Sequence, residues 1–123
     1  MERDQITHEI IDSAYKVHTK LGPGLLESAY RTCLAYELRK KGLKVEEEKP
    51  LPIIYEEIKL ECGYRLDMLV ENEVIVELKT VNAFNDVHLA QLLTYLRFSG
   101  KHIGLLLNFY VKSLKDGIKR VSL

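Results

Sequence analysis

The chain has few cysteines and no excess of charge of either sign. Its two cysteines, Cys33 and Cys62, do not have the spacing of a metal site, so we expect both to be reduced thiols in a cytoplasmic protein. The 18 acidic residues balance the 18 Lys and Arg residues. A neutral chain is not expected to coat nucleic acid by bulk electrostatics, because domains that do so are usually strongly basic.

Long apolar runs are also missing, since no stretch approaches the roughly 20 residues that a membrane-spanning helix needs. The charged start, Met1–Asp4, lacks the apolar core of a signal peptide. Hydrophobic residues nevertheless make up 46% of the chain, which excludes a disordered chain and a disulfide scaffold. The sequence has no repeat, no low-complexity segment and no linker, so we expect a single α/β domain over residues 1–123.

Two helices are expected in the first third of the chain. Apolar residues at helical spacing predict a helix over about 5–20, with Asp4 as its N-cap and Leu21–Gly24 as its stop. A second helix is predicted over about 25–41, because Arg39–Lys41 followed by Gly42 is typical of a helix C-terminus.

From Leu43 onward the pattern favours strands. We expect them near 44–56, irregular at Pro50 and Pro52, then near 58–70 and 73–80. A third helix follows at about 86–98, capped by Asn85 or Asp86 and ended by Gly100, and then an apolar strand from Ile103 to Leu107. With a short element around 117–121, the predicted order is ααβββαβ plus a C-terminal tail.

The hairpin between the last two strands of the first group predicts which residues share a face. Successive side chains on a strand point to opposite faces, so a loop at 71–73 pairs Val70 with Val74 and Asp67 with Glu77. The opposite face of the first of these strands is then an apolar stripe of Leu66, Met68 and Val70.

This register places two carboxylates, Asp67 and Glu77, side by side with Cβ atoms about 5 Å apart, and Lys79 two residues along the same face. Two carboxylates at that distance favour a shared proton or a divalent cation. The alternative is that they form ordinary ion pairs with Arg65 and Lys79 at a sheet edge.

Polar residues on two expected helices could add to such a site. Glu27 lies on the apolar stripe of the second helix and in its first turn, where negative charge is favoured; it could equally interact only with the helix dipole and local amides. His88, Gln91 and Tyr95 line one face of the third helix beside its apolar stripe. The alternative for this row is an ordinary polar boundary.

In this order, these residues resemble the PD-(D/E)XK nuclease superfamily. Asp67 followed by Glu77-Leu78-Lys79 matches the name-giving motif, with Leu66 in place of the Pro. The segment Gly24–Tyr30 is similar to the G-x-x-E-x-x-Y pattern of a small subfamily, and Gln91 with Tyr95 is similar to the Q-x-x-x-Y of an exonuclease branch. The resemblance covers nearly the whole chain and implies a restriction-endonuclease-like core, a central mixed sheet flanked by helices.

The resemblance also implies a metal-dependent phosphodiesterase that acts on DNA or RNA. Asp67, Glu77 and Glu27 would then hold Mg²⁺ or Mn²⁺, and Lys79 would orient or activate the attacking water. The residues expected to position the site or contact substrate are Gln91, Tyr95, Tyr30 and, by proximity alone, His88.

For partners, the resemblance implies nucleic acid and, as a candidate assembly, a homodimer; no membrane association is expected. Candidate phosphate contacts are Lys44, Lys49, Lys101, Lys112, Lys115 and Lys119. Two alternatives remain: a catalytically silent module of the same fold that binds nucleic acid or a protein partner, and a purely structural α/β domain.

Overall fold

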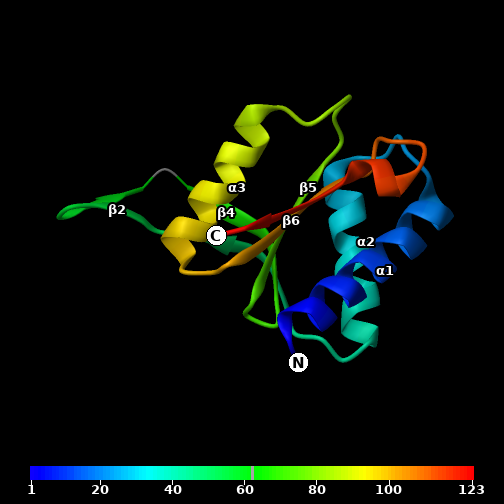
Figure 1. The fold of residues 1–123 in the computed structure, drawn as a ribbon, viewed down its shortest axis with the longest axis horizontal. Helices are drawn as coiled ribbons and strands as arrows, with labels where there is room; N and C mark the ends of the chain where they lie inside the picture. Colours follow the sequence, from blue (N-terminus) through cyan, green and yellow to red (C-terminus); the bar gives the residue numbers. More distant parts are fainter. Residues whose placement is uncertain (62) are drawn as a thin grey trace.

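A five-stranded sheet in the order β1-β4-β5-β6-β7 runs through the centre of the molecule, with helices on both faces (Figure 1). The computed structural model describes residues 1–61 and 63–123. β5 and β6 are parallel and the other neighbours are antiparallel, so the mixed sheet flanked by helices is confirmed. The strands of this sheet are β1 (Val45–Pro50), β4 (Arg65–Val70), β5 (Val74–Lys79), β6 (Ile103–Asn108) and β7 (Ile118–Ser122).

The helices divide between the two faces. α1 (Arg3–Leu21) and α2 (Glu27–Lys40) pack on one face, and α3 (Asp86–Ser99) packs on the other. A 3₁₀ turn, η1 (Leu114–Gly117), precedes the last strand. No helix in the two described ranges is long and apolar enough to cross a bilayer. Two helices, a group of strands, a third helix and a further strand follow one another as predicted, but the strand group has five members and not three. The short C-terminal element is the edge strand β7.

Helix ends differ from the prediction where tertiary contacts compete for the capping groups. α1 begins at Arg3 and its N-cap is Glu2, whose backbone N–H donates to Gln5 Oε1 at 3.2 Å. The prediction of Asp4 as N-cap is therefore wrong. Asp4 lies in the first turn instead, and its Oδ1 accepts a hydrogen bond from Arg120 of β7 at 2.7 Å. An ion pair with a distant strand thus uses the carboxylate that could have capped the helix.

The two long strands predicted over 44–56 and 58–70 are each divided, which corrects that part of the prediction. β2 (Ile53–Tyr55) and β3 (Ile58–Leu60) form a separate two-stranded sheet that projects from the body of the molecule (Figure 1). Pro50 and Pro52 lack backbone N–H groups, so the β1 ladder does not continue through them. A hydrogen bond from the Leu51 N–H to the Tyr64 carbonyl, 2.9 Å long, closes the base of this hairpin.

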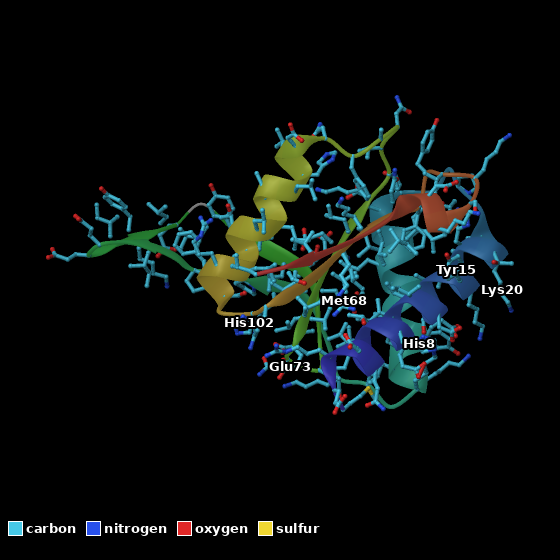
Figure 2. The ribbon with its side chains drawn as sticks, viewed as in Figure 1. His8, Tyr15, Lys20, Met68, Glu73 and His102 are labelled. Atoms are coloured by element: carbon cyan, nitrogen blue, oxygen red, sulfur yellow. The ribbon has the colours of Figure 1, made fainter. Side chains whose placement is uncertain are left out.

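The sheet separates two cores. Side chains fill the space between the sheet and the helices, and Met68 of β4 packs with Val70 beneath α1 and α2 (Figure 2). The predicted stripe is wrong at Leu66, which packs with Leu69 and Ile75 beneath α3. The alternation therefore breaks at the intervening residue, Asp67.

The partner strand β1 is irregular at the same level. Glu47 pairs with Met68 and Lys49 with Leu66, but Glu48 between them forms no ladder pair and has a φ of 48°. A residue in this left-handed region turns the strand locally and interrupts the ladder. Asp67 thus lies where the regular pairing of β4 is interrupted.

The two cysteine predictions have different outcomes. Cys33 of α2 is a free thiol, as expected. The expectation for Cys62 falls on the one residue that lies outside the described ranges.

Candidate active site

Two carboxylates lie side by side where the ladder between β4 and β5 ends. The pairs Met68–Val76, Leu69–Ile75 and Val70–Val74 confirm the register that the three-residue loop predicted. One step further, the Asp67 N–H donates to Glu77 Oε2 at 2.9 Å. In return, the Leu78 N–H donates to Asp67 Oδ2 at 2.9 Å. Each carboxylate therefore binds the backbone of the neighbouring strand, in place of the next ladder hydrogen bonds.

These carboxylates are removed from water. The Glu77 side chain is in the interior with 4% of the residue exposed, and Asp67 is half-buried. Burial, with the nearby charge of Asp67 as a second cause, raises the pKa of Glu77 to about 8. Burial also raises the pKa of Asp67, against the opposing effects of the Leu78 N–H and the Lys79 ammonium. The nearby positive charge of Lys79 therefore does not compensate for the burial of the two carboxylates.

The ion-pair alternative for these carboxylates is not found. Among the described residues, neither Asp67 nor Glu77 forms an ion pair with Arg65 or Lys79. Their strands, β4 and β5, are also interior strands of the sheet and not its edge. Carboxylates buried without a cationic partner are costly, so their presence calls for another explanation.

Lys79 and α3 border the pair from the same side. Lys79 ends β5, and its Nζ donates to Gln91 Oε1 at 3.4 Å. Tyr95, one helical turn beyond Gln91, is 6% exposed. Burial raises the pKa of its hydroxyl, and the charges of Glu77 and Asp67 raise it further. The Tyr95 ring belongs to the core beneath α3, together with Leu66 of β4 and Ile75 of β5. The structure therefore brings Gln91 and Tyr95 to the strand pair, together with Lys79.

His88, the third member of the helix row, has a different partner. Its Nδ1 accepts the Asn85 N–H at 3.2 Å, while Asn85 Oδ1 accepts the His88 N–H at 3.1 Å. The imidazole also meets the Phe84 ring edge-on, with centroids 6.1 Å apart. His88 thus completes the N-terminal cap of α3, and its hydrogen bonds go to Asn85 and not to the carboxylates.

Glu27 lies at the start of α2 and reaches the end of β5. Its Oε2 accepts the Thr80 N–H at 3.2 Å and the Thr80 hydroxyl at 3.4 Å. Glu27 is exposed at the first position of α2, on the helix face that Tyr30 and Leu34 bury one and two turns further along. Its negative charge nevertheless contributes to the raised pKa of both Asp67 and Glu77. The charge of Glu27 therefore acts on both carboxylates, while its side chain is hydrogen-bonded to Thr80, the residue that follows Lys79.

Tyr30 shapes the loop that precedes Glu27. Its hydroxyl donates to the Gly22 carbonyl at 2.5 Å and accepts the Leu25 N–H at 3.1 Å. The buried ring stacks on Phe109 with a centroid separation of 4.5 Å. Gly24 has a φ of 110°, a conformation that favours glycine. The buried Tyr30 thus ties the loop of Gly22 and Leu25 to α2, directly before and after Glu27 in the chain.

Asn108 was not identified from the sequence, although it holds the strand end that carries Lys79. Its Nδ2 donates to the Val81 carbonyl at 2.8 Å, and its Oδ1 accepts the N–H groups of Val81 at 3.2 Å and Tyr110 at 3.1 Å. The residue is 2% exposed. A polar residue closing the apolar strand β6 was the available signal, but its meaning depends on the parallel pairing of Lys79 with Asn108.

The predicted phosphate contacts separate into two groups. Lys44 and Lys49 form ion pairs with Glu46, at 3.8 and 2.7 Å. The others form no ion pair in the part of the chain that the structure describes; they are Lys101, Lys112, Lys115 and Lys119.

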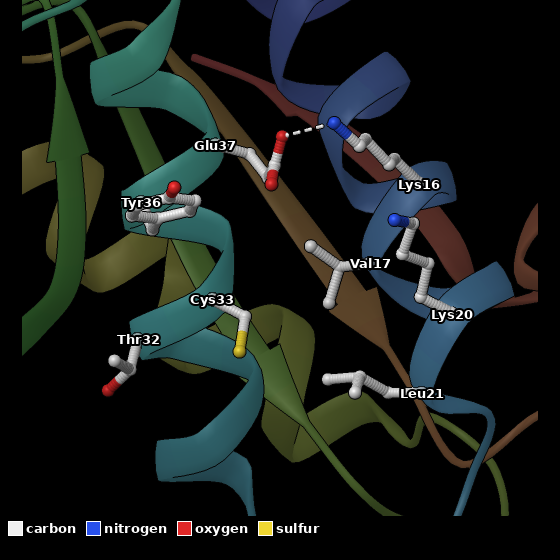
Figure 3. A pocket seen from close by; sticks show the side chains of 8 residues that line it. All are labelled: Lys16, Val17, Lys20, Leu21, Thr32, Cys33, Tyr36 and Glu37. Atoms are coloured by element: carbon white, nitrogen blue, oxygen red, sulfur yellow. Dashed lines mark ion pairs between the residues drawn. The ribbon is translucent and has the colours of Figure 1, made fainter.

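A groove between α1 and α2 is separate from these residues. It is lined by Val17, Leu21, Cys33 and Tyr36, and Lys16 pairs with Glu37 across it at 2.8 Å (Figure 3). None of the residues around the carboxylate pair lines this groove. It is therefore not a part of the candidate site.

The donor set of the pair suits a hard divalent cation. Carboxylate oxygens are the ligands that Mg²⁺ and Mn²⁺ prefer, and a cation beside Asp67 and Glu77 would supply the missing positive charge. Within the described residues, no group of three or more His, Cys, Asp or Glu side chains is arranged to hold a metal. The residues that fit a metal are therefore the two carboxylates. Glu27 is bonded to Thr80, the residue after Lys79 at the end of β5.

Comparison with known protein families agrees with this arrangement. A family model described as the PD-(D/E)XK nuclease superfamily matches residues 4–121, and the chain belongs to that superfamily. Members of the superfamily generally use divalent metals. No curated protein and no solved structure matches the chain closely enough to add to this comparison.

Proposed function

We propose that this protein is a metal-dependent nuclease that hydrolyses phosphodiester bonds in DNA or RNA. The observation that supports the proposal is the pair formed by the buried Glu77 and the half-buried Asp67, which lies next to Lys79 and has no ion-pair partner among the described residues, in a chain of the PD-(D/E)XK nuclease superfamily. The two carboxylates would hold Mg²⁺ or Mn²⁺, with Glu27 as a further ligand or as acceptor for a metal-bound water. We also assign the chain to the G-x-x-E-x-x-Y subfamily, because Gly24, Glu27 and Tyr30 match its pattern.

The chemistry would be divided among these side chains. A divalent cation bound at the pair would polarise the scissile phosphate and lower the pKa of a bound water. The Lys79 ammonium would orient the attacking water and offset the charge that develops on the phosphate oxygens. Gln91, which contacts Lys79 Nζ at 3.4 Å, would position that amine, and Tyr95 would close the same side of the site. The water oxygen would form a bond to phosphorus, the bond from phosphorus to the leaving oxygen would break, and the leaving oxygen would take up the proton that the water loses.

The experiment is a cleavage assay with labelled single-stranded, duplex and branched DNA and RNA, in Mg²⁺ or Mn²⁺. We expect cleavage by the wild type and a loss of about a hundredfold or more in Glu77→Gln and Lys79→Met. Lys40→Met is the matched control, because Lys40 lies half-exposed on α2, away from the pair. If both site variants cleave every substrate as fast as the wild type and the control do, the nuclease proposal fails.

A catalytically silent module of the same fold is the second candidate function. One observation favours it: Glu27 is engaged with Thr80, and no third carboxylate in the described residues completes a metal site. In that case the protein would bind nucleic acid or a protein partner without turnover. Binding of labelled DNA that is unchanged by Mg²⁺, with no cleavage in any condition, would favour the silent module over the nuclease.

A further inference from the structure

The β2–β3 hairpin is poorly stabilised by its own contacts. Each strand has three residues, and the hairpin projects from the body, with all of its strand side chains except the buried Ile53 exposed to solvent (Figures 1 and 2). An isolated two-stranded hairpin is marginally stable in water. Its turn residue Glu56 also has a φ of 51°, a conformation that a residue with a Cβ rarely adopts. We call this segment, Ile53–Leu60, the arm. Its own contacts stabilise it little, so a partner that covers it would stabilise it.

One face of the arm is apolar along its whole length. Ile53 pairs with Leu60 and Tyr55 with Ile58, so these four side chains share a face, while Ile54 and Lys59 share the other. At the base, Ile53 is buried in the core beneath α3. Towards the tip, Tyr55 is 64% and Ile58 is 58% exposed. The arm thus extends a buried apolar surface out into solvent.

The charge of the arm changes from tip to base. Glu56 and Glu57 form the tip, and neither has an ion-pair partner in the part of the chain that the structure describes. At the base, a hollow of about 260 Å³ is lined by apolar residues together with two lysines. Lys49 is paired with Glu46 at 2.7 Å, whereas Lys101 forms no ion pair within the described residues and supplies the positive charge of the hollow. Phe98, on its wall, is 41% exposed. The tip is therefore acidic and apolar, and the base is basic and apolar.

We propose that this arm associates two copies of the chain, side by side and antiparallel, with each acidic tip against the basic hollow of the other copy. One surface supplies both complementary halves, which is what a two-fold symmetric interface requires. The apolar faces of Tyr55 and Ile58 would be covered in the same step. A nucleic acid is disfavoured as the partner that covers the arm, because its phosphates and the acidic tip repel each other. This proposal does not depend on the nuclease activity.

Sedimentation velocity of the full chain over a concentration series tests the proposal. We expect a dimer for the wild type, and a dissociation constant weakened at least about tenfold in Tyr55→Glu and Ile58→Glu. Ile54→Glu is the matched control: Ile54 is 56% exposed on the same strand but points to the opposite face. Because all three side chains are exposed, the variants should keep the far-UV circular dichroism of the wild type.

A charge exchange tests the antiparallel arrangement separately. The double change Glu56→Lys and Glu57→Lys should weaken the dimer, and adding Lys101→Glu to it should restore association. A wild type that stays monomeric at the highest concentration overturns the proposal. Equal loss of association in Ile54→Glu also overturns it, because the effect would then not depend on the apolar face. If Tyr55→Glu leaves the dimer intact but weakens binding of labelled DNA, the arm contacts nucleic acid instead.

Discussion

Asp67 and Glu77 each accept a hydrogen bond from the backbone of the other's strand. The Asp67 N–H donates to Glu77 Oε2, and the N–H of Leu78, the residue after Glu77, donates to Asp67 Oδ2. Separating the two carboxylates would break both hydrogen bonds. The backbone therefore keeps together two groups that repel each other once both are ionised.

The stability of the metal-free protein should fall as pH rises through the range between the two pKa values of Glu77. In the folded protein this pKa is about 8, compared with 4.5 for the free group, so between these values the folded state binds more protons than the unfolded state. Glu77→Gln removes this loss. We expect the variant to be more stable than the wild type by about 2–4 kcal/mol near pH 9, and by much less near pH 4.

Urea denaturation in the presence of a chelator, at the two ends of this pH range, measures that difference. Glu73→Gln is the control, because Glu73 is an exposed partner of Arg3 at the other end of β5. Parallel pH profiles for the wild type and Glu77→Gln would contradict the assignment of the raised pKa to Glu77.

Divalent metal should stabilise the protein through the same pair. Millimolar Mg²⁺ or Mn²⁺ binds the folded state and not the unfolded one, so we expect a stabilisation of about 1–3 kcal/mol, visible as a higher Tm. Asp67→Asn should abolish the shift, whereas Glu73→Gln should keep it. The absence of any shift in the wild type would count against a metal site at Asp67 and Glu77.

Tyr30→Phe should destabilise the fold by about 1–3 kcal/mol, since the Gly22 carbonyl and the Leu25 N–H lose their partner. Tyr36→Phe is a matched control on the same helix, because Tyr36 is 62% exposed. Chemical denaturation of both variants gives the comparison. Equal stability of the two would show that the Tyr30 hydroxyl does not hold the loop before Glu27.

Asn108→Ala should lower stability by about 2–3 kcal/mol, because three backbone groups of Val81 and Tyr110 lose a buried partner. Activity should fall further than the folded fraction does, because the strand end carrying Lys79 is released. The measurement is cleavage at a temperature where the variant is fully folded, beside Asn82→Ala at an exposed position. A variant that loses stability but keeps full activity would limit Asn108 to a structural role.

Much of the fold could be predicted from local patterns. The helices at 5–20 and 86–98 follow from apolar spacing, and Asn85 caps the second of them as predicted. The first begins earlier than predicted, at Arg3, and Asp4 bonds to Arg120 instead of capping it. The register at Asp67 and Glu77 was also predictable, since a three-residue loop determines which residues are opposite each other.

The sequence by itself therefore determined the order of the elements and the proximity of the two carboxylates, both of which depend on residues close together in the chain. Only the tertiary structure decided that Leu66 packs in the core beneath α3. It also decided that Glu27 accepts a hydrogen bond from Thr80 and that Asn108 donates one to the Val81 carbonyl. These contacts join segments that are distant in sequence, through the parallel pairing of β5 with β6 and the packing of α2 against the sheet. Local periodicity carries no information about which distant segments meet, because their pairing depends on the energy of the whole packed arrangement.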